Sequence, residues 1–260
     1  KSVFDRAAQV SFSDDEKTMY AGETRATAWL DEDTGLMKHS LTAALESAGA
    51  GCNAVDYVMA GKERQAFCAT RPPGHHATYD SAMGFCVFNN IVLAARYALQ
   101  NYNLQRVAIV DFDVHHGNGT EQIVAGDQRI MLCSSFQHPF YPHSGAPVSA
   151  SNILAVPLEA GITGDVFREK VQHWFDALSN FQPQLIFISA GFDAHAEDPM
   201  AHLRLVEDDY FWISQALRRV ADTCCEGRIV SMLEGGYNLS ALGRSVVAHL
   251  KGLSQPKRLF

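Results

Sequence analysis

The sequence lacks three features that would place it in common classes of protein. Its 260 residues contain no run of about 18 apolar residues, so no membrane-spanning helix is expected. They contain no block of basic residues either, and 21 Lys and Arg against 29 Asp and Glu give a formal net charge of -8. This balance argues against a protein that binds nucleic acids directly or attaches to a membrane surface. The six cysteines include no Cys-x-x-Cys pair, which argues against a structural zinc site.

The cysteines that are present lie mostly in apolar or small-residue runs. This context is typical of reduced thiols in a protein core, and it predicts a reducing compartment and a cytoplasmic location. With 47% hydrophobic residues the chain is long enough for one large α/β domain, and no linker or internal repeat divides it. We therefore predict a single domain over residues 1–260.

Short β-rich runs alternate with longer helical patterns, which is typical of a parallel sheet with helices on both faces. The predicted strands are 66–70, 107–113, 130–134, 153–157, 185–190 and 229–233. The predicted helices are 36–59, 88–100, 164–181, 207–224 and 239–251. Ligands of such sheets bind beyond the carboxyl ends of the strands, so residues just after these strands are the candidates for chemistry.

The richest of these strand ends follows residues 107–110, an apolar run. Asp111, Asp113 and His115 are spaced by two, so they would project to one side if the strand continued through them. A catalytic metal typically takes three protein ligands, and Asp113, His115 and Asp193 could supply them. Two carboxylates and one imidazole favour zinc, but Fe(II), Co(II) or Mn(II) would also be accommodated.

Two further strand ends carry acid/base and donor groups. His75 and His76 follow a Pro-Pro-Gly turn, and adjacent imidazoles can act as general acid/base and electrostatic partner when each is oriented by a second hydrogen bond. Asp111 and Asn118 could be those orienting groups. Tyr237, on a Gly-Gly turn, could donate its hydroxyl to a developing oxyanion. Glu234, just before that turn, is given no role.

Four motifs together resemble the zinc-dependent histone deacetylase family, in its class II-like and bacterial histone deacetylase-like amidohydrolase branch. They are Arg-Pro-Pro-Gly-His-His at 71–76, Asp-Phe-Asp-Val-His-His-Gly-Asn-Gly-Thr at 111–120, Ser-Ala-Gly-Phe-Asp-Ala-His at 189–195 and Glu-Gly-Gly-Tyr-Asn at 234–238. The resemblance extends from about Phe4 to Leu253. It implies the arginase/deacetylase fold, a three-layer, eight-stranded and predominantly parallel sheet, and hydrolysis of the amide in N-ε-acyl-lysine with one zinc ion per chain.

The resemblance also implies roles for individual residues. It makes Asp113, His115 and Asp193 the zinc ligands, His76 the general base and acid, and Tyr237 the stabiliser of the oxyanion. Asp111 matches the partner of His75. Asn118 falls where class I members have an aspartate that pairs with the second histidine, and asparagine should leave His76 less stabilised as an imidazolium.

Two further sets of positions match the family by resemblance only. The apolar walls of the acyl-lysine tunnel match Gly84, Phe85, Tyr141 and Met200. A monovalent cation site, expected to hold potassium, matches Asp111, Asp113, His115, Ser135 and Phe136.

The sequence departs from the family in two places. The family begins with a strand and a loop with a His-Pro-Glu-type segment, and these have no counterpart before Lys1, so the N-terminal part of the sheet and one rim of the pocket are expected to be incomplete. Tyr141 stands where phenylalanine is common, so it would add a hydroxyl to the tunnel wall.

Several alternatives stay open. An acetylpolyamine amidohydrolase or an acetoin-utilisation-type deacetylase of the same superfamily fits most of the motifs, although the segment 192–195 favours a lysine deacylase. A catalytically dead acyl-lysine binding module is a third alternative. Arginase-like chemistry is disfavoured because a second metal would need further carboxylates. His116 and His195 either pack or support the metal ligands, and the oligomeric state is open.

Overall fold

The computed structural model describes residues 28–148 and 150–254, in which six parallel strands form one sheet with the order β3-β8-β7-β4-β5-β6. These strands are β3 (Gln65–Cys68), β4 (Val107–Asp111), β5 (Ile130–Gln137), β6 (Ile153–Leu158), β7 (Ile186–Ala190) and β8 (Ile229–Leu233). Every neighbouring pair runs parallel. The predicted parallel sheet is therefore confirmed.

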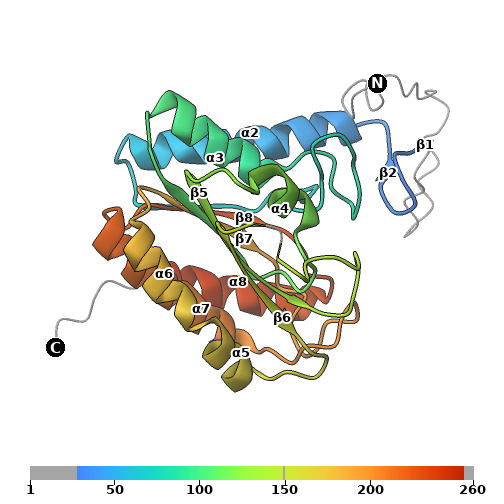
Figure 1. The fold of residues 1–260 in the computed structure, drawn as a ribbon. Coiled ribbons are helices and arrows are strands. Elements are labelled where there is room, and N and C mark those ends of the chain that lie inside the picture. The colour runs from blue at the N-terminus through green and yellow to red at the C-terminus, as the bar shows by residue number, and fades with distance from the viewer. Residues whose placement is uncertain (1–27, 149, 255–260) are drawn as a thin grey trace.

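Helices cover both faces of this sheet, as Figure 1 shows. Helices α2 (Ser40–Met59) and α3 (Asn90–Asn101) lie on one face, and α5 (Gly164–Val171), α6 (His173–Phe181), α7 (Glu207–Cys224) and α8 (Leu239–Ser254) lie on the other. The short helix α4 (Asn118–Val124) follows β4. The predicted three-layer α/β architecture is confirmed. Within the described residues, no helix is both long and apolar enough to span a membrane.

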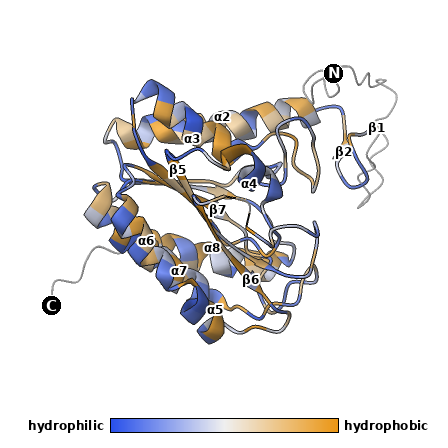
Figure 2. Cartoon of the chain, viewed as in Figure 1, coloured by the Kyte–Doolittle hydropathy of each residue, from blue (hydrophilic) through white to orange (hydrophobic). Residues whose placement is uncertain are grey.

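The central strands are apolar on both faces because helices bury both faces. All five residues of β4 and all five of β7 are buried. Along β4, Val107 and Ile109 belong to the core under α2 and α3, whereas Ala108 and Val110 belong to the core under α5 to α8. Figure 2 shows hydrophobic strands between helices that carry both hydrophobic and hydrophilic residues. A rigid sheet therefore carries the loops at its carboxyl edge.

Two details differ from the predictions. The single helix predicted over 164–181 is divided at Gln172 into α5 and α6, and both Val171 and Trp174 are fully buried, so each half turns its own apolar side to the sheet. The resemblance implied eight strands, but the described residues contain six in the main sheet. Residues 28–64 form α2 and a separate antiparallel pair, β1 (Ala28–Trp29) with β2 (Gly35–Leu36), and therefore none of them extends the sheet beyond β3.

Candidate active site

The carboxyl end of β4 turns earlier than predicted. The strand ends at Asp111, so Asp113 and His115 lie in a loop, and the prediction of a strand through residue 113 is wrong. The reason is a pair of local hydrogen bonds: Asp111 Oδ1 accepts the Asp113 N–H at 3.0 Å, and Asp113 Oδ1 accepts the His115 N–H at 2.9 Å. Aspartate side chains commonly bind backbone N–H groups two residues ahead in this way, and they bend the chain.

Three side chains from two strand ends form a buried cluster of metal-ligand types. The His115 Nδ1 atom lies 3.2 Å from Asp113 Oδ1 and 3.2 Å from Asp193 Oδ2. All three residues are buried, and their ligand atoms lie within 4.8 Å of one another. Around a tetrahedral zinc ion with ligands at about 2.0–2.1 Å, neighbouring ligand atoms lie roughly 3.3 Å apart. The separations therefore fit a zinc-sized ion.

The remaining carboxylate oxygens are largely held by the backbone. Asp113 Oδ2 accepts the Gly235 N–H at 2.8 Å, and Asp193 Oδ1 accepts the Val114 N–H at 3.0 Å. Asp193 Oδ2, which faces His115, is buried and has no hydrogen-bond partner in the described part of the chain. Such outer hydrogen bonds orient metal ligands, and an oxygen left without a donor is suited to bind a cation.

The charges of the cluster also fit a cation. Burial and the negative charge of Asp113 raise the pKa of Asp193 to about 6. Burial alone would lower the pKa of His115, but the adjacent carboxylates of Asp113 and Asp193 raise it to about 10. Two buried carboxylates that repel each other are costly, and a divalent cation between them would offset that cost.

The two tandem histidines are each oriented by a different group. His75 Nδ1 lies 3.0 Å from Asp111 Oδ2, and His76 Nδ1 lies 2.8 Å from Asn118 Oδ1. Burial would lower the pKa of His75, but the carboxylates of Asp113 and Asp111 raise it well above its usual value. His76 lacks such a partner, so burial and the neighbouring His75 lower its pKa well below its usual value.

The orientation of His76 suits it to accept a proton. The amide oxygen of Asn118 can only accept a hydrogen bond, so it selects the tautomer of His76 with hydrogen on Nδ1. The Nε2 atom then carries the lone pair. Together with its lowered pKa, this makes His76 a neutral base near pH 7, whereas His75 stays positively charged next to Asp111 and Asp113.

Three of the four positions predicted for the tunnel walls, Gly84, Phe85 and Tyr141, pack beside the groups described above. The Phe85 ring contacts the Tyr237 ring edge-on, with 6.2 Å between centroids, and the Tyr141 ring contacts the rings of His76 and His115 at 5.3 and 6.0 Å. Gly84 packs against His76, and a Cβ at this position would collide with the imidazole. Burial and the carboxylates of Asp193 and Asp113 raise the pKa of Tyr237, so its hydroxyl stays protonated and can donate.

Asp33 joins two of these walls, a contact that the sequence analysis missed. Its Oδ2 accepts the hydroxyl of Tyr141 at 3.0 Å, and its Oδ1 accepts the Gly84 N–H at 2.8 Å. The extra hydroxyl of Tyr141 therefore points to Asp33. Nothing in the local sequence indicates that Asp33 contacts Gly84, 51 positions away, or Tyr141, 108 positions away.

Glu234 is a second residue whose position the sequence analysis did not predict. It is buried at the end of β8, where Oε2 accepts the N–H groups of Gly74 and His75 at 2.7 and 3.1 Å, and Oε1 accepts the Ser189 hydroxyl at 2.9 Å. Burial raises its pKa to about 7. Glu234 thus fixes the backbone of the tandem histidines. The sequence did contain one signal, an acidic residue at the end of an apolar strand. Because an unpaired buried carboxylate is costly, such a residue indicates that a hydrogen-bond partner lies nearby.

The remaining predicted positions lie nearby in different settings. His116 hydrogen bonds through Nε2 to Glu121 at 2.9 Å and through Nδ1 to Ser144 at 2.8 Å. His195 accepts the Glu197 N–H at 3.1 Å. Both histidines therefore support loops, and neither belongs to the metal-type cluster found in the described residues. Ser135 and Phe136, proposed for potassium, are buried in β5 just beyond Ser134, which pairs with Asp111.

Comparison with known proteins agrees with this geometry. A family model described as "Histone deacetylase domain" matches residues 6–253. Type-2 histone deacetylase 1 of Dictyostelium discoideum is 38% identical over 86% of this chain, which spans 20% of that protein. An uncharacterised Synechocystis protein is 41% identical, with 86% of this chain and 73% of its own length covered. The histone deacetylase-like amidohydrolase of Pseudomonas aeruginosa is 36% identical, over 88% of this chain and 63% of its own length.

A solved structure shows the same fold. The crystal structure of the HDA15 HD domain superposes with a TM-score of 0.81 at 34% identity, and the match covers 87% of this chain and 66% of that one. The chain spans only about a fifth of the Dictyostelium relative named above. From the family match over residues 6–253 and the 41% identity to a relative that is covered over most of its length, the chain belongs to the histone deacetylase domain family.

Proposed function

We propose that residues 1–260 form one deacetylase-like catalytic domain that hydrolyses the amide of N-ε-acetyl-lysine in proteins or peptides. One observation carries this proposal: a metal-type cluster with ligand atoms 3.2 Å apart lies beside a neutral histidine and beneath apolar rings. Such walls suit the four-carbon stem of lysine, and the cluster suits the amide at its end.

The proposed metal is zinc, one ion per chain, held by Asp113, His115 and Asp193. When bound, a divalent metal acidifies water and polarises a carbonyl group. His76 Nε2 accepts the proton of the attacking water and later returns it to the leaving amine. Tyr237 donates its hydroxyl to the oxyanion that develops on the former carbonyl oxygen, while His75, held by Asp111, supplies positive charge. The products are acetate and the free lysine amine.

A second candidate is an acetylpolyamine amidohydrolase, and Asp33 is the observation that favours it. Its half-buried carboxylate beside Tyr141 could attract a second ammonium group of a polyamine. However, both of its oxygens already accept hydrogen bonds, from Gly84 and Tyr141, so neither is free for a second ammonium group. We therefore favour the lysine substrate.

The experiment that separates these functions measures turnover of an acetyl-lysine peptide and of acetylputrescine side by side, with zinc-loaded protein. We expect the peptide to be strongly preferred. A strong preference for acetylputrescine would establish the second candidate instead. Zinc-loaded, folded protein without amidase activity on either substrate would indicate a non-catalytic binding module.

Tyr237→Phe should lower kcat by about 10²-fold with little change in KM. The change removes one hydroxyl donor to the oxyanion, and loss of such a donor typically has this magnitude. The ring contact with Phe85 should persist, so binding of the lysine stem should not suffer. Steady-state kinetics on the acetyl-lysine peptide test this, and near-normal turnover would remove Tyr237 from the proposed role.

Asn118→Asp should move the acid limb of the pH profile to higher pH. A carboxylate in place of the amide, 2.8 Å from His76 Nδ1, would stabilise the imidazolium and raise the pKa of His76. A base with a raised pKa is lost to protonation at a higher pH. The midpoint of the acid limb of kcat/KM should therefore lie about one pH unit or more above that of the wild type. A profile that does not move would show that His76 is not the group responsible for the acid limb.

Two further features are proposed by resemblance. Potassium is proposed beside the zinc site, near Asp111, Ser135 and Phe136, where β4 and β5 pair in parallel. Rates measured in potassium against tetramethylammonium chloride test this. A reducing, cytoplasmic location is also proposed, because all six cysteines are free thiols and four of them are buried.

A further inference from the structure

The carboxylate of Asp198 binds three backbone N–H groups from two loops. Its Oδ2 accepts the N–H of Tyr237 at 2.7 Å and of Asn238 at 3.0 Å, and its Oδ1 accepts the N–H of Met200 at 3.0 Å. Asp198 is buried, which shields these bonds from water. Hydrogen bonds to a carboxylate are about twice as strong as those between neutral groups. Asp198 is thus a strong local anchor.

This anchor joins the loops that follow neighbouring strands. Asp198 and Met200 follow β7, Tyr237 follows β8, and the two strands pair in parallel. Tyr237 leaves β8 through Gly236, whose φ of 140° is open mainly to glycine. A glycine turn alone leaves the direction of the next side chain loosely defined. The bond from the Tyr237 N–H to Asp198 supplies the missing constraint.

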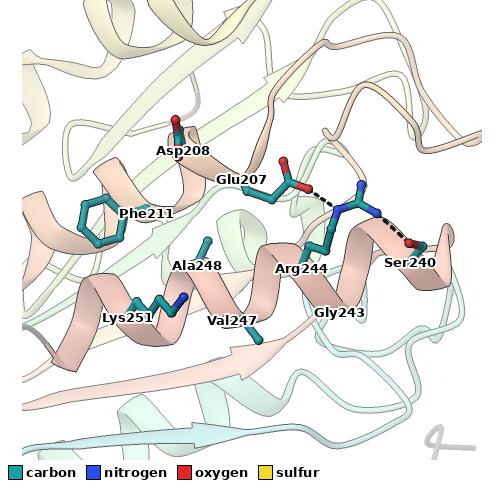
Figure 3. Close-up of a pocket in the computed structure, with 9 residues that line it drawn as sticks. All are labelled: Glu207, Asp208, Phe211, Ser240, Gly243, Arg244, Val247, Ala248 and Lys251. Carbon is teal, nitrogen blue, oxygen red and sulfur yellow. Dashed lines mark hydrogen bonds and ion pairs between the residues drawn. The ribbon is translucent and has the colours of Figure 1, made fainter.

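Glu197, the residue before Asp198, is also bound by exposed side chains at the start of α8. Arg244 of α8 binds Glu197 at 2.7 Å, and Asn238 Nδ2 donates to the Glu197 carbonyl at 3.0 Å. Figure 3 shows Arg244 between Glu207 and Ser240 in the groove of α7 and α8. The Arg244 ion pairs are exposed, so they contribute little on their own. The buried bonds of Asp198 are therefore stronger links between the two loops than these ion pairs, and they act beside the bond from the Phe192 N–H to the Gly235 carbonyl at 2.8 Å.

We propose that Asp198 is a positioning residue that fixes the Tyr237 hydroxyl and also holds the backbone of Met200, a position proposed for the tunnel wall. The inference rests on the proposed function, in which Tyr237 stabilises the oxyanion. It adds a residue that touches neither substrate nor metal. Because a displacement of about 1 Å at a catalytic group can lower a rate by about 10²-fold, Asp198 should act through the direction of Tyr237 rather than through its own chemistry.

The test is a double-mutant cycle on the zinc-loaded domain with an acetyl-lysine peptide. Asp198→Ala should lower kcat by about 10-fold to 10²-fold and change KM less than about threefold. Adding it to Tyr237→Phe should cause little further loss, because the hydroxyl that it positions is already absent. Asp198→Asn keeps the shape and one acceptor oxygen, so its kcat should lie between those of Asp198→Ala and the wild type. If Asp198→Ala does not fold, Asp198→Asn takes its place in the double-mutant cycle.

A second measurement separates positioning from general damage. A hydroxamate mimic of acetyl-lysine should bind more weakly to Asp198→Asn, but no more weakly to the double variant than to Tyr237→Phe, while the zinc content stays at one per chain. The matched control is Asp209→Asn, because Asp209 is another buried carboxylate that binds a backbone N–H, that of Val206 at 2.9 Å. It should lower Tm and leave kcat unchanged.

Two outcomes would overturn the inference. In the first, the double variant loses kcat by the product of the two single-variant factors, so that Asp198 acts independently of the Tyr237 hydroxyl. In the second, the Asp198 variants have a lower Tm but an unchanged kcat, as in the control. Failure of the proposed function is distinct from both, because the wild type would then not hydrolyse the peptide, or Tyr237→Phe would hydrolyse it at the normal rate.

Discussion

Asp193→Asn should make the metal-free protein more stable and the metal-loaded enzyme inactive. In the wild type, burial and Asp113 raise the pKa of Asp193 to about 6, compared with about 3.9 in an unfolded chain. A carboxyl with a raised folded-state pKa binds its proton more tightly when folded. Its ionisation therefore opposes folding, and this cost grows as the pH rises from about 4 to about 6 and stays constant above.

The size of the effect follows from the pKa difference. A shift of two pKa units corresponds to about 3 kcal/mol, which asparagine would remove because it stays neutral and its Oδ1 can still accept the Val114 N–H. With about 2 °C of Tm per kcal/mol for a chain of this size, the metal-free variant should melt roughly 5 °C above the metal-free wild type at pH 7, and the difference should vanish near pH 4.

The same substitution should weaken zinc binding by more than about 100-fold, because even the loss of a group that only orients a ligand costs 10-fold to 100-fold. Thermal melts of chelator-treated protein and a competitive zinc titration give the two quantities. Asp209→Asn is the contrasting variant, since that buried carboxylate is paired with Arg168 at 2.7 Å and its loss should lower Tm. If metal-free Asp193→Asn melts below the wild type, the two carboxylates do not repel each other as described.

The sequence was informative where function depends on residues that are neighbours in the chain. The apolar run before Asp111, the pair His75 and His76, and the Gly-Gly-Tyr turn each predicted a strand end with reactive groups, and the structure brings all of these together. The strand after Val110 was predicted too long, because alternation cannot show that the side chain of Asp111 binds the backbone two residues ahead.

Residues whose partners are distant backbone groups could not be predicted in the same way. Glu234 binds N–H groups about 160 residues away, Asp33 binds a hydroxyl 108 residues away, and Asp198 binds N–H groups about 40 residues away. Every residue except proline has a backbone N–H, so the partner leaves no mark in the sequence. Only the cost of burying an unpaired carboxylate indicates that a partner exists, and the fold is needed to identify it.

The two tandem histidines should respond very differently to alanine substitution. His76→Ala should lower kcat by about 10³-fold, within the range for loss of a general acid/base, and it should also remove the acid limb of the pH profile. The reason is that His76 is neutral, with its Nε2 atom left as the acceptor by the bond from Nδ1 to Asn118. KM should change little, because the rings of Phe85 and Tyr141 that would hold the substrate stem remain.

His75→Ala is the matched variant, because it removes an equally buried imidazole from the next position. The carboxylates of Asp113 and Asp111 raise the pKa of His75 well above its usual value, which favours its protonated form and makes it a poorer proton acceptor than His76. Its loss should lower kcat by a smaller factor, through charge alone, and should leave the acid limb in place. Single-turnover rates of both variants between pH 5 and 9 therefore distinguish the roles. If His75→Ala were the variant that lost the acid limb, His75 would be the base, and Asn118 would orient only an electrostatic partner.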